Sequence, residues 1–192
     1  TMSVATIMPD VRADLGGLSL YGWAFSGLAL GELVGIVIAG AWAGRANPVQ
    51  PILAGLSVYA VGLILSGFAG SMLMVVIGRV LQGYGAGAVP AVAYVCIGRG
   101  YAEAQRPRVF AWMSTAWVVP SLVGPGVASV VSHHFGWRWV FLGLIPVVII
   151  AGAMALAPIA RLGPPTVPAA SKSVARTFGV AGVAVVGAGL AL

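Results

Sequence analysis

Long apolar runs follow one another along most of this chain, and they restrict its possible folds more than any other feature. A helix needs about 20 apolar residues to cross a lipid bilayer. Only 7% of the 192 residues are charged, whereas a soluble domain carries about 25%. Four acids and ten bases cannot cover the surface of a soluble protein. We therefore expect an all-α membrane protein in which lipid surrounds most of the chain.

The positions of these runs predict six membrane spans and the start of a seventh. The first span is the tail of a helix that ends near Pro9, and the seventh begins near Thr177. The complete spans between them are predicted at residues 20–43, 51–70, 71–97, 109–132 and 137–157.

A polar segment rich in proline and small residues, "RLGPPTVPAASKSVAR", separates the last two predicted spans and favours an extended linker. We expect residues 1–158 to form a six-helix transmembrane bundle, residues 159–176 to form a cytoplasmic linker, and residues 177–192 to begin a truncated seventh helix. The chain starts without methionine and inside a span, and it stops inside another, so we interpret it as a fragment of a longer protein.

Basic residues are concentrated in alternate connections between the predicted spans. The connections after the second, fourth and sixth spans hold Arg45, Arg99, Arg106, Arg108, Arg161, Lys172 and Arg176. The other connections hold Arg12 and Arg138. The positive-inside rule places the first set in the cytoplasm, and we expect a multi-pass protein of the plasma membrane. The bases do not form one stripe, which argues against nucleic acid as a partner.

Residue clusters that carry enzyme chemistry are missing from the sequence. Cys96 is the single cysteine, and His133 and His134 are adjacent without metal-ligand spacing to other candidates. The glycine-rich "GYGAG" lies inside a predicted span rather than after a strand, so it does not fit a nucleotide loop. We therefore expect no metal, no cofactor and no enzymatic activity.

One arginine lies within the fourth predicted span, in "IGRVLQGYGAGAVP". A charge near the bilayer centre costs at least about 2.5–3.5 kcal/mol, which favours burial of Arg79 toward the bundle. Gln82 shares its helix face, and Gly83 and Gly87 lie on the same side, where they permit close approach of a helix or a solute. The alternative is that Arg79 extends to the membrane interface.

Glu32 is the acid that lies deepest in a predicted span, in "SGLALGELVGIVIAG". Gly27, Gly31 and Gly35 are spaced by four beside it, which predicts a close contact with another helix. A carboxylate at this depth is a candidate proton carrier. The alternative is a neutral glutamic acid that is hydrogen-bonded to a neighbouring helix.

The fifth predicted span contains two prolines, Pro120 and Pro125, and the second is flanked by Gly124 and Gly126. Proline removes a helix hydrogen bond, so we expect a kinked helix with a glycine face. Such a face suits a contact that must rock during alternating access, although a kinked helix without a coupling role remains open. The following "WRW" at residues 137–139 is typical of an interfacial belt.

Several segments resemble motifs of the major facilitator superfamily, in particular its drug:proton antiporter branches. Residues 78–88 resemble the fourth-helix motif, and residues 120–129 resemble the fifth-helix antiporter motif. Residues 137–147 are similar to the start of the sixth helix, and residues 5–17 to the end of the first. The matching positions in the two central motifs are Arg79, Gln82, Gly83, Gly124 and Pro125; Pro120 and Ala128 replace glycines of the family pattern.

The connection between the second and third spans, "GAWAGRANPVQP", resembles the cytoplasmic gate loop of the same family. Gly40 and Arg45 match the family pattern. Gly44 stands where the family has an aspartate that helps to latch the gate, and the second basic cluster is missing. This difference puts ordinary gating in doubt.

The resemblance implies the N-terminal half of a twelve- or fourteen-helix transporter, with the C-terminal half of the same protein, a small-molecule substrate, protons and the lipid bilayer as partners. It implies proton-coupled export of small amphipathic or cationic compounds. Arg79, Gln82 and Glu32 would line the substrate and proton pathway, and Pro120, Gly124, Pro125 and Gly126 would form the hinge. An uptake symporter of the same fold, or a degenerate membrane fragment that does not transport, remain as alternatives.

Overall fold

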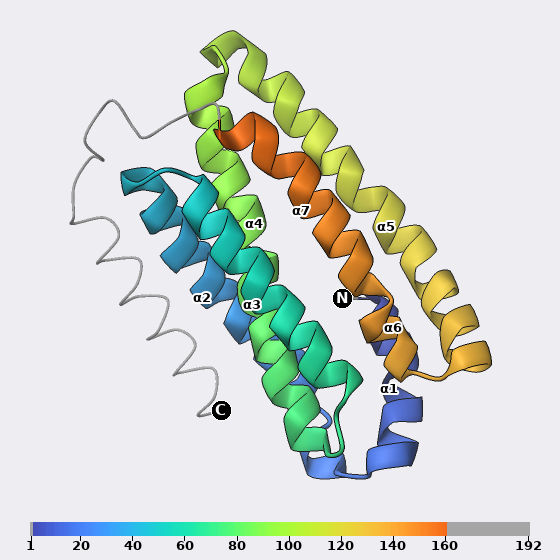
Figure 1. The fold of residues 1–192 in the computed structure, drawn as a ribbon. Helices are drawn as coiled ribbons and strands as arrows, with labels where there is room; N and C mark the ends of the chain where they lie inside the picture. Colours follow the sequence, from blue (N-terminus) through green and yellow to red (C-terminus); the bar gives the residue numbers. More distant parts are fainter. Residues whose placement is uncertain (1, 161–192) are drawn as a thin grey trace.

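The computed structural model describes residues 2–160 of the chain, and these residues form helices joined by short connections, with no strand in that range (Figure 1). The helices are α1 (Met2–Leu15), α2 (Trp23–Arg45), α3 (Val49–Gly67), α4 (Met72–Gly100), α5 (Arg106–Phe135), α6 (Arg138–Leu142) and α7 (Leu144–Ala160), with 3₁₀ turns at Leu18–Leu20 and Glu103–Gln105. The predicted seventh span and nearly all of the predicted linker lie outside the described residues.

Four helical segments of the described part are long and apolar enough to cross a membrane: Leu18–Arg45, Val49–Gly67, Met72–Gly100 and Arg138–Leu156. They correspond to the second, third, fourth and sixth predicted spans. Helix α5 covers the predicted fifth span but is not among these four, so its crossing of the membrane stays a prediction. The expected all-α membrane bundle is confirmed.

Helix α1 is longer than the sequence predicted. It continues through Pro9 to Leu15, because one proline removes a single helix hydrogen bond while Val11 on the next turn is fully buried. The helix ends at Gly16 and Gly17, whose φ angles of 66° and 71° lie in the left-handed region that glycine tolerates.

The predicted sixth span is interrupted. Helix α6 ends at Leu142, and α7 begins at Leu144 after Gly143. Pro146 explains the break, because its nitrogen cannot donate to the carbonyl of Leu142 and its ring would press against that carbonyl in a continuous helix.

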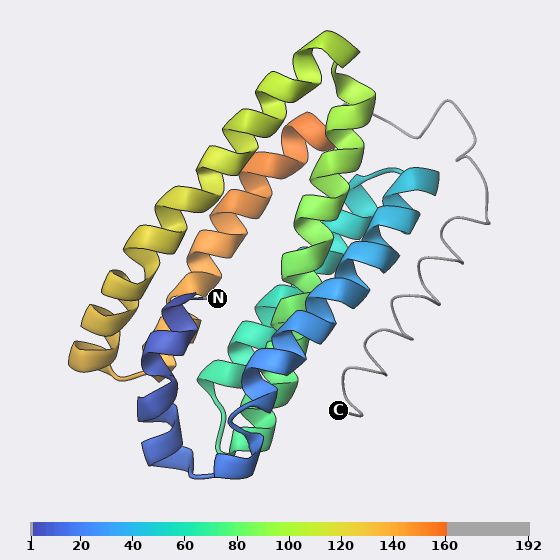
Figure 2. The same cartoon turned by 180° about the vertical axis from the view of Figure 1, so that it is seen from behind.

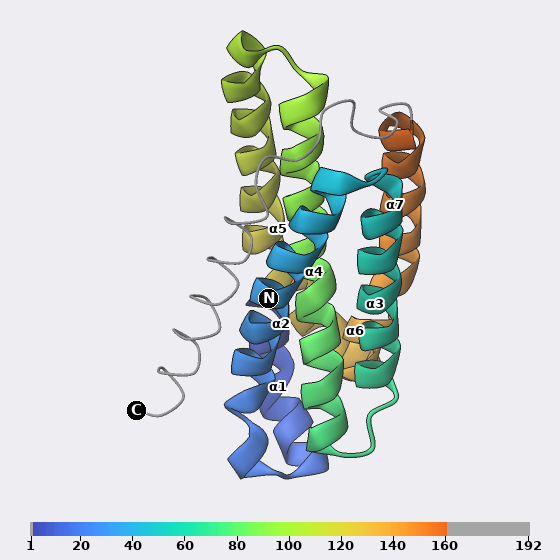
Figure 3. The ribbon, with the colours of Figure 1, turned by 90° about the vertical axis from the view of Figure 1, so that its left-hand side faces the viewer.

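Helix α4 is the central element of the bundle. In Figure 3 it lies between α2 and α3, and these two pairings are the most extensive in the structure. Helix α1 packs against α5, and the views of Figures 1 and 2 place both of them on the other side of the bundle, together with α6 and α7. The bundle therefore has a compact three-helix part and a more open part.

Two apolar clusters fill the interior. The larger joins α1, α4 and α6 through Ile7, Val11, Val75 and Phe141, all of which are fully buried. The smaller joins the far ends of α2, α3 and α4. Many large apolar side chains face outward instead, such as Leu122 at 76% exposure, as expected of a surface that meets lipid or another protein rather than water.

Candidate functional site

Arg79 is enclosed by the bundle, with only 3% of its surface exposed. Its Nε donates a hydrogen bond to the carbonyl oxygen of Ala24 on α2 at 3.3 Å, and a terminal nitrogen donates to Oε1 of Gln82 at 3.0 Å. The side chain therefore turns into the three-helix part and does not extend to an interface. Its charge meets the dipoles of a carbonyl and an amide, and within residues 2–160 no ion pair reaches it.

Gln82 extends these contacts to α3. Its Nε2 donates to the carbonyl oxygen of Gly62 at 3.0 Å and to Oγ of Ser66 at 2.9 Å. Arg79, Gln82 and Ser66, with the carbonyls of Ala24 and Gly62, form one hydrogen-bonded group across α2, α3 and α4, which we call the Arg79 network. The sequence analysis did not select Ser66.

Glycines allow α2 to approach α4 closely enough for this network to form. A Cβ atom at Gly31 or Gly35 would overlap the backbone of α4, and a Cβ atom at Gly83 or Gly87 would overlap the backbone of α2. The close contact predicted from the glycine spacing in α2 is therefore confirmed, and α4 supplies the matching glycines. The two helices run parallel, since later residues of α2 meet later residues of α4.

A second set of glycines brings α3 against α4. A Cβ atom at Gly62 would lie 2.7 Å from the backbone nitrogen of Gln82, and one at Gly55 would lie 2.8 Å from Cβ of Ala88. A Cβ atom at Gly78 would overlap Oγ of Ser66 and lie 2.9 Å from the carbonyl oxygen of Gly62. The two acceptors of the Gln82 amide group therefore lie directly against a glycine of α4.

Glu32 is half-buried on α2 and is not brought to Arg79. It follows Ala24, the residue whose carbonyl binds Arg79, by eight positions, or about 12 Å along a helix. Its backbone lies against Gly87, and among the described residues no hydrogen bond joins its carboxylate to the Arg79 network. Glu32 and Arg79 therefore make no direct contact in the described residues, and their place in one pathway stays a prediction.

The fifth-helix motif lies in the open part of the bundle. Helix α5 runs without interruption through Pro125, so the expected kink stays a prediction, and the side chain of Pro120 lies outside the described part of the structure. Gly124 and Pro125 are half-buried, whereas Gly126 is exposed and a Cβ atom there would meet nothing within 4 Å. Gly126 borders a shallow apolar groove on α5, formed with Leu122, Val123, Val127, Val130 and Val131.

The connection that resembles the gate loop is short. Arg45 is exposed at the end of α2, Gly40 is half-buried with its Cβ position 3.8 Å from Cβ of Ala91, and the Cβ position of Gly44 is open. Arg99, near the end of α4, donates a hydrogen bond to the carbonyl of Ala43. A cation at the carbonyl end of a helix interacts favourably with its dipole, so Arg99 links α2 to α4 at this end.

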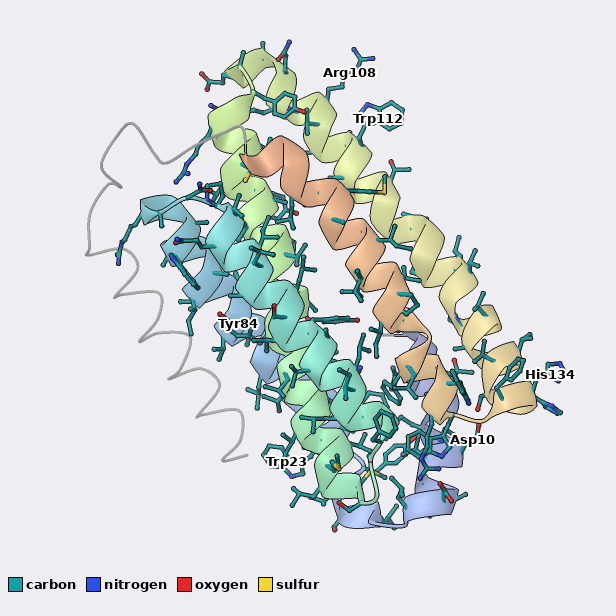
Figure 4. The ribbon with its side chains drawn as sticks, in the orientation of Figure 1. Asp10, Trp23, Tyr84, Arg108, Trp112 and His134 are labelled. Atoms are coloured by element: carbon teal, nitrogen blue, oxygen red, sulfur yellow. The ribbon has the colours of Figure 1, made fainter. Side chains whose placement is uncertain are left out.

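A third polar group lies at the opposite end of the bundle and was missed by the sequence analysis. Asp14 of α1 pairs with Arg138 at 2.9 Å and accepts a hydrogen bond from the indole nitrogen of Trp137 at 3.1 Å. One turn earlier, Asp10 accepts from Ser132 of α5 at 2.8 Å. Figure 4 shows Asp10 at the same end of the bundle as His134, and Arg108 at the other end. We call Asp14, Trp137 and Arg138 the Asp14 cluster.

The sequence model of the major facilitator superfamily matches residues 1–191. The chain belongs to this superfamily. The family resemblance stated from the motifs is thereby confirmed. Membership in the major facilitator superfamily makes this a chain of a multi-pass membrane transporter family rather than of an enzyme family.

Relatives within the superfamily include proteins named for drug resistance. The chain is 30% identical over 149 residues to the azole resistance protein 1 of Saccharomyces cerevisiae, covering 76% of this chain and 24% of that protein. It is 31% identical over 148 residues to the multidrug transporter protein MdtP of Bacillus subtilis, covering 77% of this chain and 27% of that protein. It is 27% identical over 158 residues to multidrug resistance protein 3 of Bacillus subtilis, covering 82% and 30%. The chain thus spans about a quarter of the length of the relatives it matches.

In this major facilitator chain, the two family motifs occupy different surroundings. The fourth-helix residues Arg79, Gln82 and Gly83 are buried among α2, α3 and α4. The fifth-helix residues lie on a helix whose apolar groove is uncovered by the described residues. The first motif is complete within this part of the protein, and the second offers a surface for a further element.

Proposed function

We propose that this chain belongs to a secondary transporter that exports small amphipathic or cationic compounds in exchange for protons, by alternating access across the plasma membrane. The drug-resistance names of several relatives support the substrate class. The observation that carries the proposal is the buried guanidinium of Arg79, whose positive charge has no acidic partner within the described residues.

A charge held in this way can couple protonation to conformation. In the low-dielectric interior, a carboxylate that gains or loses a proton changes its interaction with a nearby guanidinium far more than it would in water. Arg79 would be the fixed positive charge of that step, and Gln82 would hold it in place. Glu32 would assist as a proton carrier farther along α2, because it is half-buried and lies beside the contact between α2 and α4.

The remaining motif residues would take mechanical roles. Pro120, Gly124, Pro125 and Gly126 would form the surface of α5 on which the C-terminal half rocks, since the groove beside Gly126 is apolar and open. Gly40 and Arg45 would belong to the cytoplasmic gate, with the connections after α2 and α4 in the cytoplasm. Residues 159–176 would link the two halves.

The test uses the full-length protein in a host that lacks its own efflux pumps. Cells are loaded with a fluorescent lipophilic cation, and its loss is followed with and without a protonophore. We expect protonophore-sensitive loss that disappears in Arg79→Ala and persists in Arg108→Ala, the matched control on the exposed start of α5. Membrane content and melting temperature of each variant show whether it folds.

The direction of transport is tested in vesicles. An antiporter accumulates the cation when the vesicle interior is acid, whereas an uptake symporter does so when the exterior is acid. If the protonophore does not change the rate at which cells lose the cation, proton coupling is refuted. If the protein is well expressed but transports nothing, the alternative of a degenerate membrane fragment, suggested by Gly44 in the gate loop, is favoured.

A further inference from the structure

Ser66 lies at the end of the Arg79 network and is fully buried at 0% exposure. Together with Gln82 and Arg79 it makes up the buried polar and charged side chains of the described residues. All three belong to one hydrogen-bonded chain rather than to separate sites. The oxygen of this serine accepts a hydrogen bond from a glutamine of another helix, so Ser66 links α3 to α4.

The carbonyl of Gly62 and the guanidinium of Arg79 decide which way the Gln82 amide group points, and the hydroxyl of Ser66 accepts the second amide hydrogen. Both hydrogens of Nε2 are used, one by the carbonyl of Gly62 and one by Oγ of Ser66. The amide oxygen must therefore face the other way, toward Arg79. In the reversed orientation the amide hydrogens would meet the guanidinium, which has five donors and no acceptor, and the carbonyl of Gly62 would meet an oxygen.

The orientation of Gln82 in turn fixes Arg79. The guanidinium is held by two acceptors on two elements, Oε1 of Gln82 and the carbonyl of Ala24 on α2. The carbonyl is rigid because it belongs to a helix backbone, whereas the glutamine side chain has rotatable bonds. Ser66 and Gly62 restrict those bonds, so α3 controls the position of a charge that lies between α2 and α4.

We propose that Ser66 is a positioning residue for Arg79 and that it acts through Gln82. The expected effect of Ser66 on transport rests on the proposed function. Its effect on the position of Arg79 does not. Ser66 contacts neither substrate nor proton. It keeps the guanidinium of Arg79 in the orientation in which its electrostatic interaction changes when another group gains or loses a proton.

Other titratable groups around Arg79 must be considered in any pH measurement. Tyr59 on α3 lies against Gly85 of α4, and Glu32 is the half-buried acid of α2. Asp10 and Asp14 of α1, which packs against the same end of α4, are engaged by Ser132 and by Arg138. Ser66 cannot itself titrate in the physiological range, so an effect of its replacement on a pH profile reports on another group.

The transport test compares Ser66→Ala with Gln82→Leu and with the double variant in the full-length protein. Ser57→Ala, at an exposed position of the same helix, is the matched control. We expect Ser66→Ala to lower proton-driven export of the lipophilic cation several-fold and to shift its pH profile in the same direction as Gln82→Leu. The double variant should have the profile of Gln82→Leu alone. An unchanged profile in Ser66→Ala, or a further shift in the double variant, would overturn the proposal.

A second measurement does not depend on transport. Melting temperatures of purified Ser66→Ala, Arg79→Met and the double variant form a cycle, with Ser66→Ala combined with Asp14→Asn as the distant control. We expect the double variant with Arg79→Met to melt higher than the sum of the single shifts predicts, while the control pair is additive. Additive shifts in both pairs would refute the linkage. If the parent shows no proton-driven export and the cycle is non-additive, the proposed function fails and the positioning role stands.

Discussion

The two helices that carry family motifs, α4 and α5, use their glycines in opposite ways. Four glycines in the middle of α4 lie where a Cβ atom would overlap the backbone of α2 or α3: Gly78, Gly83, Gly85 and Gly87. Gly126 of α5 lies where a side chain would meet nothing. Both helices look alike in composition, with small residues spaced along an apolar stretch.

The difference shows that a glycine in a membrane helix marks a close contact only when a partner is present. In α4 the contacts are made inside the described bundle, and they position the Arg79 network. In α5, Gly126 lies beside an apolar groove that the described residues leave open, and we proposed above that the C-terminal half packs there. Four substitutions test this comparison, from the largest expected effect on stability to the smallest.

Gly31→Leu should have the largest effect. The new side chain would enter the backbone of α4 near Val80, where no flexible side chain can give way. We expect a loss of about 3 kcal/mol, the upper part of the usual range for overpacking. Thermal unfolding of the purified protein in detergent measures it, and a variant that melts like the parent would mean that α2 and α4 are not in backbone contact.

Gln82→Leu should come second. It removes the acceptor for Arg79 and the donor for the carbonyl of Gly62, so buried polar groups on two helices lose their partners. Leaving such groups unsatisfied costs about 2 kcal/mol, and more where a charge is involved. The same unfolding measurement applies, and Gln50→Leu, at an exposed position of α3, is the matched control.

Asp14→Asn should cost about 0.5 kcal/mol, because the pair with Arg138 is exposed and exposed ion pairs contribute little. Both side chains keep nearly half of their surface in solvent, at 49% and 45%. The loss should shrink further at high salt, which screens the parent's ion pair. Unfolding at two salt concentrations measures this, and a loss above about 2 kcal/mol would show that the Asp14 cluster is a buried element of the fold.

Gly126→Leu should leave the stability of this bundle nearly unchanged, because the added side chain enters open space. In the full-length protein it should lower transport at least tenfold, since it would occupy the groove proposed for the C-terminal half. Stability and efflux are measured on the same variant. A strong loss of stability in the N-terminal bundle, or normal efflux, would show that Gly126 of α5 does not differ from the glycines of α4 in the way described.

Part of this structure could be predicted from the sequence because its signals are local. The charge deficit and the apolar runs predicted the membrane helices, and the spacing of Gly27, Gly31 and Gly35 predicted a close contact. The insertion cost of a charge predicted that Arg79 is enclosed. None of these signals identifies the partner, because spacing describes one helix at a time.

The hydrogen-bond partners could not be predicted, because they depend on how the helices pair and because some of the partners are backbone atoms, which are the same in every residue. Arg79 binds the carbonyl of Ala24, and every residue has such a carbonyl. Ser66 gains its role because α3 lies antiparallel against α4, which its own sequence does not reveal. The helix break at Gly143 has a signal in the sequence, which is Pro146. Asp10 and Asp14 also have a signal, their spacing of four residues, but their partners lie more than 120 residues away in the chain.

That separation has a consequence for biosynthesis. Asp14 and Arg138 are 124 residues apart in the chain, and synthesis proceeds at about 5–20 residues per second, so roughly 6–25 s pass before the arginine is made. During that interval the two aspartates of α1 have neither Ser132 nor Arg138 available. The hydrogen bonds that join α2, α3 and α4 connect residues 16 to 56 positions apart, so these helices can associate meanwhile. The Asp14 cluster can therefore form only after Trp137 and Arg138 are made, and among the described helices it joins the first to a much later one.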